Sequence, residues 1–283
     1  CTQDKNGFHI AGGILNANEN SAVILLGHER AGTHLLKSIL GSSPRIQCTG
    51  EICKITSADE RAARTNYFNH RLQQIRADER FAFPLLKNQR DLLTSYFHEL
   101  EKIYHKSSRI IMDVKYSHVH NFNVFWTSNS ISPYLFRFAD EFGLKFIHLY
   151  RQKALLAILS NELAGARQLW NTSDQDELED KVIVVKPAYV LKECRKLTDW
   201  QSEMSRYCKP LKCVELRYEE LLREGKFNPD RSAEIANFLG VEEDWQSIPA
   251  LVKVSPHPEK FVRNLGELEA FFKRAGADHL WQL

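Results

Sequence analysis

The chain has 283 residues, of which 43% are hydrophobic, enough for a large apolar core. Its 38 Lys and Arg residues nearly balance its 36 Asp and Glu residues, and the net charge of +2 excludes a broad basic surface for nucleic acid. No apolar run reaches the length of a membrane span. Any site for an anionic ligand is therefore expected to be local.

The first residues of the chain and its cysteines indicate the cellular compartment. The segment CTQDKNGFHIAGG contains no apolar core typical of a signal peptide. Six cysteines in a chain of this length, without the spacing of a disulfide framework or a metal site, are expected to be reduced thiols. No linker rich in Pro, Gly or Ser divides the chain. We therefore expect a cytoplasmic protein that forms a single domain over residues 1–283.

Short apolar runs and helical patterns alternate along the chain. Four runs are typical of buried strands: Ala22–Leu26, Ile110–Val114, Phe146–Tyr150 and Cys213–Arg217. Helical patterns occupy residues 58–79, 89–105, 133–142, 153–170, 186–207, 230–239 and 265–275. This alternation predicts an α/β fold, with a P-loop-like, mostly parallel sheet and helices on both faces. Ligands bind such sheets at the carboxyl ends of the strands.

The segment GHERAGTHLL, residues 27–36, follows the first run directly. A strand, a glycine-bounded turn and a helix N-terminus favour an anion, because the first amides of a helix have no acceptor within it. Gly27 and Gly32 have the spacing of the ATP and GTP phosphate loop, but Thr33 stands where that loop carries a lysine. One terminal phosphate held by amides, a hydroxyl and Arg30 is therefore expected rather than a nucleoside triphosphate.

A second candidate phosphate site follows the third run. Arg151 ends that run, and Ser160 stands nine residues later in the next helical pattern. An arginine at the carboxyl end of a strand lies on the ligand edge, where its guanidinium and a serine hydroxyl can bind a phosphate together. The alternative is a surface arginine and an unrelated helix serine.

The two motifs, Arg30-x-Gly32-Thr33 and Arg151 with Ser160, resemble the phosphate-binding motifs of the sulfotransferases, which use 3′-phosphoadenosine-5′-phosphosulfate (PAPS). The segments ELRYEELLREG and EIANFLGV, within residues 215–241, resemble others of that family. The segment RNLGELEAFF, residues 263–272, resembles the tail of its bacterial members, including the nodulation-factor type. The resemblance spans residues 22–272 in consistent order. It departs at Ala31, which replaces a usual serine, and at His34, which replaces a threonine or serine.

The resemblance implies a sulfotransferase fold and roles for individual residues. The residues expected at the 5′-phosphosulfate are Arg30, Ala31, Gly32, Thr33 and His34. Arg151 and Ser160 are expected at the 3′-phosphate, and Tyr218 near the adenine. Lys253 or Arg263, before the last helix, is expected to close over the nucleotide.

Sulfuryl transfer needs a base for the acceptor proton and a cation near the bridging oxygen. Two residues compete as the base: Glu51 in RIQCTGEI, after the first helix, and His118 in MDVKYSHVHNF, after the second run. We expect Lys115 to stabilise the bridging oxygen. Alternation separates Lys115 from His118 if the strand continues, whereas a turn after Tyr116 brings them together. No metal is expected, since His118 and His120 lack a third ligand in the sequence.

The acceptor is expected to be a small molecule or glycan with a hydroxyl or amine, and bacterial natural products are among the candidates. Four aromatic residues are candidates for the wall of the acceptor pocket: Phe122, Phe125, Trp126 and Trp170. The alternative is that they belong to the hydrophobic core. The acidic residues within 174–180 either form a solvated loop or attract a cationic acceptor. The resemblance also allows a homodimer. Two other functions remain open, a P-loop-type nucleotide kinase and a non-catalytic nucleotide-binding module.

Overall fold

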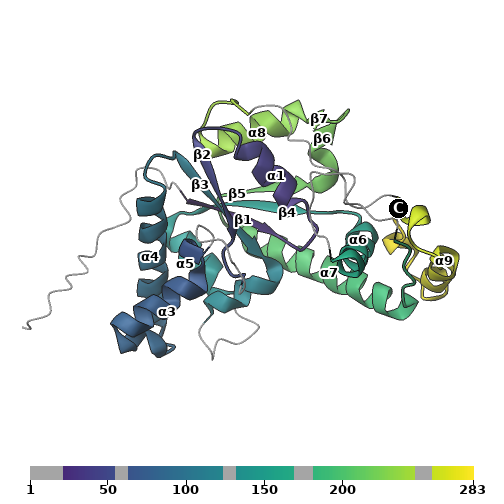
Figure 1. Cartoon of the computed structure of the whole chain (residues 1–283), viewed down its shortest axis with the longest axis horizontal. Helices are drawn as coiled ribbons and strands as arrows, with labels where there is room; N and C mark the ends of the chain where they lie inside the picture. The colour runs from purple at the N-terminus through teal and green to yellow at the C-terminus, as the bar shows by residue number, and fades with distance from the viewer. Residues whose placement is uncertain (1–21, 55–62, 124–131, 169–180, 246–256) are drawn as a thin grey trace, which may run out of the picture.

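The computed structural model describes residues 22–54, 63–123, 132–168, 181–245 and 257–283, and a five-stranded sheet lies at its centre (Figure 1). Its strands are β1 (Ala22–Gly27), β2 (Ile46–Glu51), β3 (Arg109–Lys115), β4 (Lys145–Tyr150) and β5 (Cys213–Arg217). All pairings in this sheet are parallel, and the strand order is β2-β3-β1-β4-β5. The prediction of an α/β fold with a mostly parallel sheet is confirmed.

Helices cover both faces of the sheet (Figure 1). One face carries α1 (Thr33–Leu40) and α8 (Pro229–Leu239), and the other carries α4 (Leu86–Ile103), α5 (Tyr134–Phe142) and α7 (Pro187–Cys208). Side chains alternate along β1, so that Val23 and Leu25 face α1 and α8 while Ile24 and Leu26 face α4 and α5. Burial on both faces explains why β1 is a continuous apolar run.

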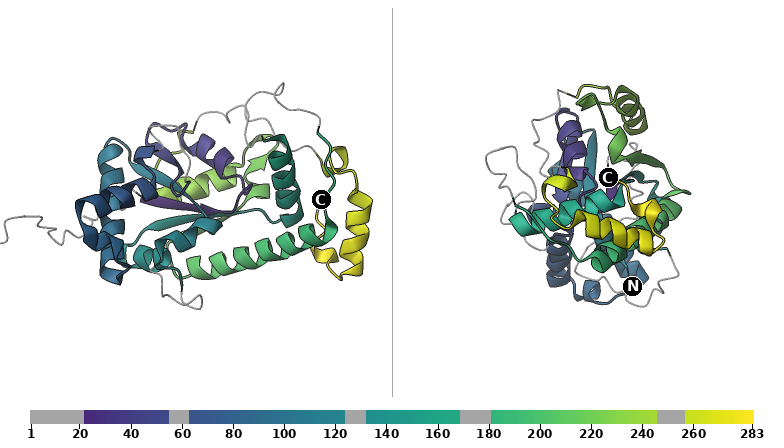
Figure 2. Two further views of the ribbon diagram at one scale, coloured as in Figure 1. Left: turned by 60° about the horizontal axis from the view of Figure 1, so that its bottom comes forward. Right: turned by 90° about the vertical axis from the view of Figure 1, so that its right-hand side faces the viewer.

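A third apolar cluster lies beyond the sheet, around the first half of α7 (Pro187–Cys208). It joins α6 (Ala154–Arg167), the first half of α7 and α9 (Leu265–Arg274). Leu159 of α6, Cys194 of α7 and Phe272 of α9 are fully buried in it. Figure 2 shows α9 packed across the end of α7, away from α4. The 22 residues of α7 therefore connect the sheet to the C-terminal helix.

The remaining elements are short. They are α3 (Tyr67–Ala77), the 3₁₀ turns η1 (Glu79–Ala82), η2 (Tyr116–Phe122), η3 (Tyr218–Glu220), η4 (Pro258–Lys260) and η5 (Asp278–Leu280), and the hairpin of β6 (Leu222–Arg223) with β7 (Lys226–Phe227). Each predicted helical pattern contains a helix. The helix α3 is shorter than the expected 58–79, of which residues 58–62 lie outside the described part. The strand β2 was not predicted. No helix in the described ranges is long and apolar enough to span a bilayer.

Candidate functional site

The candidate residues gather at the carboxyl edge of the sheet. Gly27, the last residue of β1, is in register with Lys115 of β3 on one side and with Leu149 of β4 on the other. Glu51 ends β2 beside Asp113 of β3. Because β1 continues into a loop between two neighbours that run in the same direction, this edge is where a parallel sheet of this kind binds its ligand.

The loop between β1 and α1 has an unusual backbone. Arg30 has a φ of 65°, and Gly32, the N-cap of α1, has a φ of 93°. No side chain caps α1, and the amide of Leu36 makes the first helical bond, to the carbonyl of Gly32. The amides that precede Leu36 at this helix end have no acceptor within the helix and are available to an anion.

Tyr218 makes glycine necessary at position 32. A Cβ on Gly32 would lie 2.2 Å from Cδ2 of the Tyr218 ring, too close for any side chain. On the same ring lies the guanidinium of Arg151, with its Cζ 4.8 Å from the ring centroid. Tyr218 therefore contacts both the loop and the arginine that follows β4.

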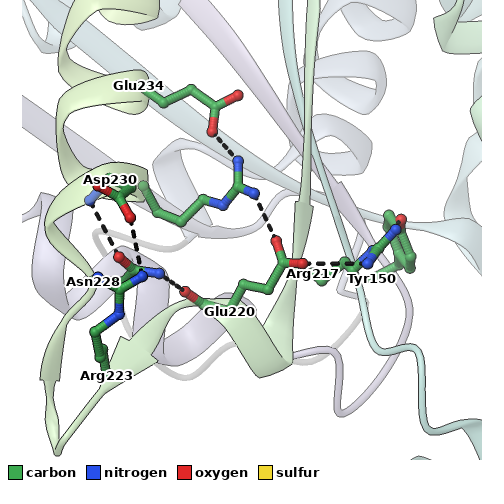
Figure 3. A network of polar contacts seen from close by, with 8 residues as sticks. Tyr150, Arg217, Glu220, Arg223, Asn228, Asp230 and Glu234 are labelled. Atoms are coloured by element: carbon green, nitrogen blue, oxygen red, sulfur yellow. Dashed lines mark hydrogen bonds and ion pairs between the residues drawn. The ribbon is translucent and has the colours of Figure 1, made fainter.

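A salt-bridge network holds the segment that carries Tyr218. The carboxylate of Glu220 lies 2.8 Å from Arg231 and 3.3 Å from Arg217, and Nε of Arg217 donates to the Tyr150 hydroxyl at 3.3 Å. The backbone carbonyl of Glu220 accepts from Nδ2 of Asn228 at 2.9 Å. Figure 3 shows these groups bridging β4, β5 and the start of α8. Glu220 thus fixes the turn beside the site.

Arg30 and Arg151 lie together. Nε of Arg30 donates to the hydroxyl of buried Ser160 at 3.0 Å. Burial and the neighbouring charge of Arg151 lower the pKa of Arg30, and burial lowers that of Arg151. Two guanidinium groups that are close together and largely buried from solvent repel one another. An anion bound between them would relieve that repulsion.

Arg151 has an unsatisfied donor. Its side chain is almost fully buried, and Nε makes no hydrogen bond within the described residues. Oε1 of Glu219 lies 3.9 Å from this Nε, beyond hydrogen-bond distance. A buried donor without an acceptor is costly, so this nitrogen is suited to an oxygen of a bound anion.

Lys115 links the loop to Glu51. Its Nζ donates to Oγ1 of Thr33 at 2.5 Å and pairs with Asp113 at 2.8 Å, while Oε1 of Glu51 lies 3.9 Å away. Lys37 pairs with the other oxygen of Asp113 at 2.7 Å. Burial alone would raise the pKa of Asp113, but the two lysines outweigh it and the pKa lies below its ordinary value.

His118 joins this group because β3 ends at Lys115 and η2 begins at Tyr116. Burial lowers the pKa of His118, and the charges of Glu51 and Lys115 also act on it. Its Nδ1 is buried without a hydrogen-bond partner in the described ranges. The turn after Tyr116 therefore brings the two candidate bases and the candidate cation together.

The other predicted residues have different positions. His34 is exposed in the first turn of α1, and its partial burial and Lys37 lower its pKa. Arg263 is exposed before α9. Lys253 lies outside the described residues.

The prediction for Phe122 as a pocket wall is wrong. Its side chain is 1% exposed and packs on Tyr67, with the ring centroids 4.7 Å apart, so it belongs to the core. Phe125, Trp126, Trp170 and the acidic run at 174–180 lie outside the described residues. The sequence reasoning missed His28, which is buried in the loop directly after β1, although its position after Gly27 was a signal.

A glycine-bounded loop at the carboxyl edge of a parallel sheet is typical of α/β proteins that bind anionic ligands at the strand ends. Residues 22–247 match the family model described as "Sulfotransferase family", and the chain belongs to that family. It is a sulfotransferase. A crystal structure of a sulfotransferase from Alicyclobacillus acidocaldarius is similar, with a TM-score of 0.45 and 15% identity over 91% of this chain and 94% of that one. No curated protein matches the sequence.

Proposed function

We propose that this sulfotransferase takes its sulfuryl group from PAPS and transfers it to a hydroxyl or amine of a small molecule or glycan. The observation that carries the proposal is the unsatisfied Nε of buried Arg151, held close to Arg30 at the loop edge. A sulfuryl donor with separate phosphates at the two ends of its ribose needs a positively charged group at each phosphate. The loop with Arg30 provides one and Arg151 provides the other, and Ser160, whose hydroxyl accepts from Nε of Arg30, is proposed beside Arg151 at the 3′-phosphate.

The residues at this edge fit such a nucleotide. The free amides at the start of α1 and the Thr33 hydroxyl suit the 5′-phosphosulfate, and His34 adds a donor at the same helix end. Ala31 is a fully buried residue of this loop, and its amide donates to the carbonyl of His28 at 3.2 Å, so its proposed contribution is to the shape of the loop. Tyr218, beside Arg151, is proposed to border the adenine. Lys253 and Arg263 stay candidates for closing over the nucleotide.

We propose Lys115 as the group that meets negative charge on the bridging oxygen, because it joins Thr33 of the loop to the candidate bases. PAPS supplies the sulfuryl group and the leaving phosphate. His118 is the favoured base: burial lowers its pKa, which favours the neutral ring, and its Nδ1 has no hydrogen-bond partner among the described residues. Glu51, which faces Lys115, then orients that lysine, and remains the alternative base.

Binding of adenosine 3′,5′-bisphosphate (PAP), the desulfated product, tests the nucleotide part. We expect PAP to raise the unfolding temperature in EDTA as well as in Mg²⁺, since a ligand at 100 times its Kd stabilises by about 2.7 kcal/mol. ATP in Mg²⁺ is the control. Stabilisation by ATP that requires Mg²⁺, with none by PAP, would instead support a nucleotide kinase.

Transfer of labelled sulfate from PAPS to a panel of amino sugars, alcohols and phenols tests the reaction. We expect a labelled product with at least one acceptor class. Binding of PAP with no transfer to any acceptor would favour a non-catalytic nucleotide-binding module.

The cytoplasm stays the proposed location, since the cysteines in the described part are free thiols. A homodimer is a further proposal, which sedimentation analysis tests.

A further inference from the structure

His28 is a buried titratable residue at the beginning of the anion-binding loop, and the roles proposed above do not use it. Its side chain is 2% exposed. Nδ1 lies 2.5 Å from the carbonyl oxygen of Glu29. Because a carbonyl oxygen only accepts, Nδ1 carries the proton and Nε2 of the neutral ring is an acceptor. Nε2 is buried and has no partner among the described residues.

The groups around His28 come from several elements. Its own loop contributes Glu29, the end of β3 contributes Lys115, and the residue after β4 is Arg151. The ring of Tyr116, from η2, packs against it with centroids 5.8 Å apart. Burial and the two cations outweigh Glu29 and lower the pKa of His28 to about 4. The ring is therefore neutral at pH 7 in the free protein.

Tyr116 is itself held in place. Its hydroxyl lies 2.5 Å from Nε2 of His148, which is fully buried, and Nδ1 of His148 lies 3.1 Å from a carboxylate oxygen of Glu215. This chain of contacts runs from the loop across β4 to β5. It fixes the ring on which His28 packs, so the His28 ring is positioned before any ligand arrives.

A bound anion favours the protonated form of the His28 ring. Burial is the main cause of the low pKa of His28, and Lys115 and Arg151 add to it. Negative charge beside the two cations offsets their part, and an anion oxygen at Nε2 accepts a second N–H in place of the water that burial removes. A neutral ring would instead present a lone pair to that anion. Nothing else in the described part satisfies Nε2.

We propose that His28 is a further residue of the donor site, which takes one proton from solvent onto Nε2 as the anionic end of the nucleotide binds and then donates that N–H to it. The inference rests on the proposed function, because it uses the same loop. It extends that function by coupling nucleotide binding to proton uptake.

Calorimetry with PAP as the probe tests the coupling. Titrations at pH 6.5 in buffers of different ionisation enthalpy give the number of protons taken up per PAP bound. PAP phosphates also exchange protons on binding, since their second pKa is near 6. The informative quantity is therefore the difference between the wild type and His28→Asn. We expect the wild type to take up about one proton more, because a single ring nitrogen titrates.

His120→Asn is the matched control, since His120 is an exposed histidine of η2 outside the proposed site. It should take up as many protons as the wild type. A direct readout uses the wild type with ¹⁵N-labelled histidine: the His28 Nε2 resonance should change from unprotonated to protonated when PAP is added. This second measurement decides the matter even if His28→Asn does not fold.

Equal proton uptake by the wild type and His28→Asn, or an Nε2 that stays unprotonated in the PAP complex, overturns the inference. In either case PAP still binds, and the proposed function stands. Absence of any PAP binding overturns both.

Discussion

Nε of Arg30 donates to the hydroxyl of Ser160 across 3.0 Å, although 130 residues separate them in the chain. The bond joins the loop after β1 to α6, which follows β4. Because Arg151 begins the turn into α6, the same bond brings the two candidate phosphate-binding motifs into one site.

Replacing either arginine should weaken nucleotide binding. Arg30→Ala and Arg151→Ala each remove a hydrogen bond to a charged phosphate, worth about 1.5–3 kcal/mol, so the Kd for PAP should rise roughly 10- to 100-fold. Calorimetry measures the change. Arg206→Ala, an exposed arginine on α7, is the control and should leave the Kd unchanged. Unchanged affinity in Arg151→Ala would place the 3′-phosphate elsewhere.

Two substitutions separate the candidate bases. His118→Asn should lower kcat about 10²- to 10⁴-fold, the usual contribution of a general base, while the affinity for PAP stays the same. Glu51→Gln should lower kcat less, because it only loosens Lys115. The wild-type rate should rise with pH through a pKa below 6.5, since burial disfavours protonated His118. A larger loss of kcat in Glu51→Gln would reverse the assignment.

Gly32→Ala should damage both the fold and the site. Position 32 has a φ of 93°, and the added methyl group would meet the Tyr218 ring. A strained non-glycine residue costs about 1–3 kcal/mol, and displacement of Tyr218 should also weaken PAP binding. Urea unfolding and calorimetry measure the two effects. Gly165→Ala is the control: it lies within α6 in open space and should stabilise by about 0.5–1 kcal/mol.

Asp113→Asn should be strongly destabilising. It leaves Lys37 and Lys115 without the carboxylate between them, and breaking a buried pair costs about 3–5 kcal/mol. The pKa of Asp113 is lower in the folded protein than in the unfolded chain, so its contribution is present above the unfolded value, near 4, and is lost as the pH falls through the folded value.

Urea unfolding at several pH values checks this prediction. The wild type should lose part of its free energy of unfolding below pH 4, and Asp113→Asn should lack that part of the pH dependence. Parallel pH profiles for the two proteins would show that the carboxylate is not stabilised by its lysines.

The sequence predicted the centre of the sheet because β1, β3, β4 and β5 are short apolar runs. It did not predict β2, whose sequence IQCTGE is an edge strand with half-exposed positions and no apolar run. Glu51 was expected only to follow the first helix, and the structure shows that it ends a strand beside Asp113. The arginines were predictable from their positions after strands, since parallel strands end at one edge.

The amino-acid sequence by itself determined which residues could bind an anion: the loop after the first apolar run, Arg151 after the third, and a glycine where the chain turns into a helix. These follow from local backbone geometry and from the residue types. The tertiary structure alone decided that Arg30 contacts Ser160, that the turn after Tyr116 brings His118 near Lys115, and that Nε2 of buried His28 has no partner among the described residues. Such contacts depend on packing between distant segments, which local sequence patterns do not encode.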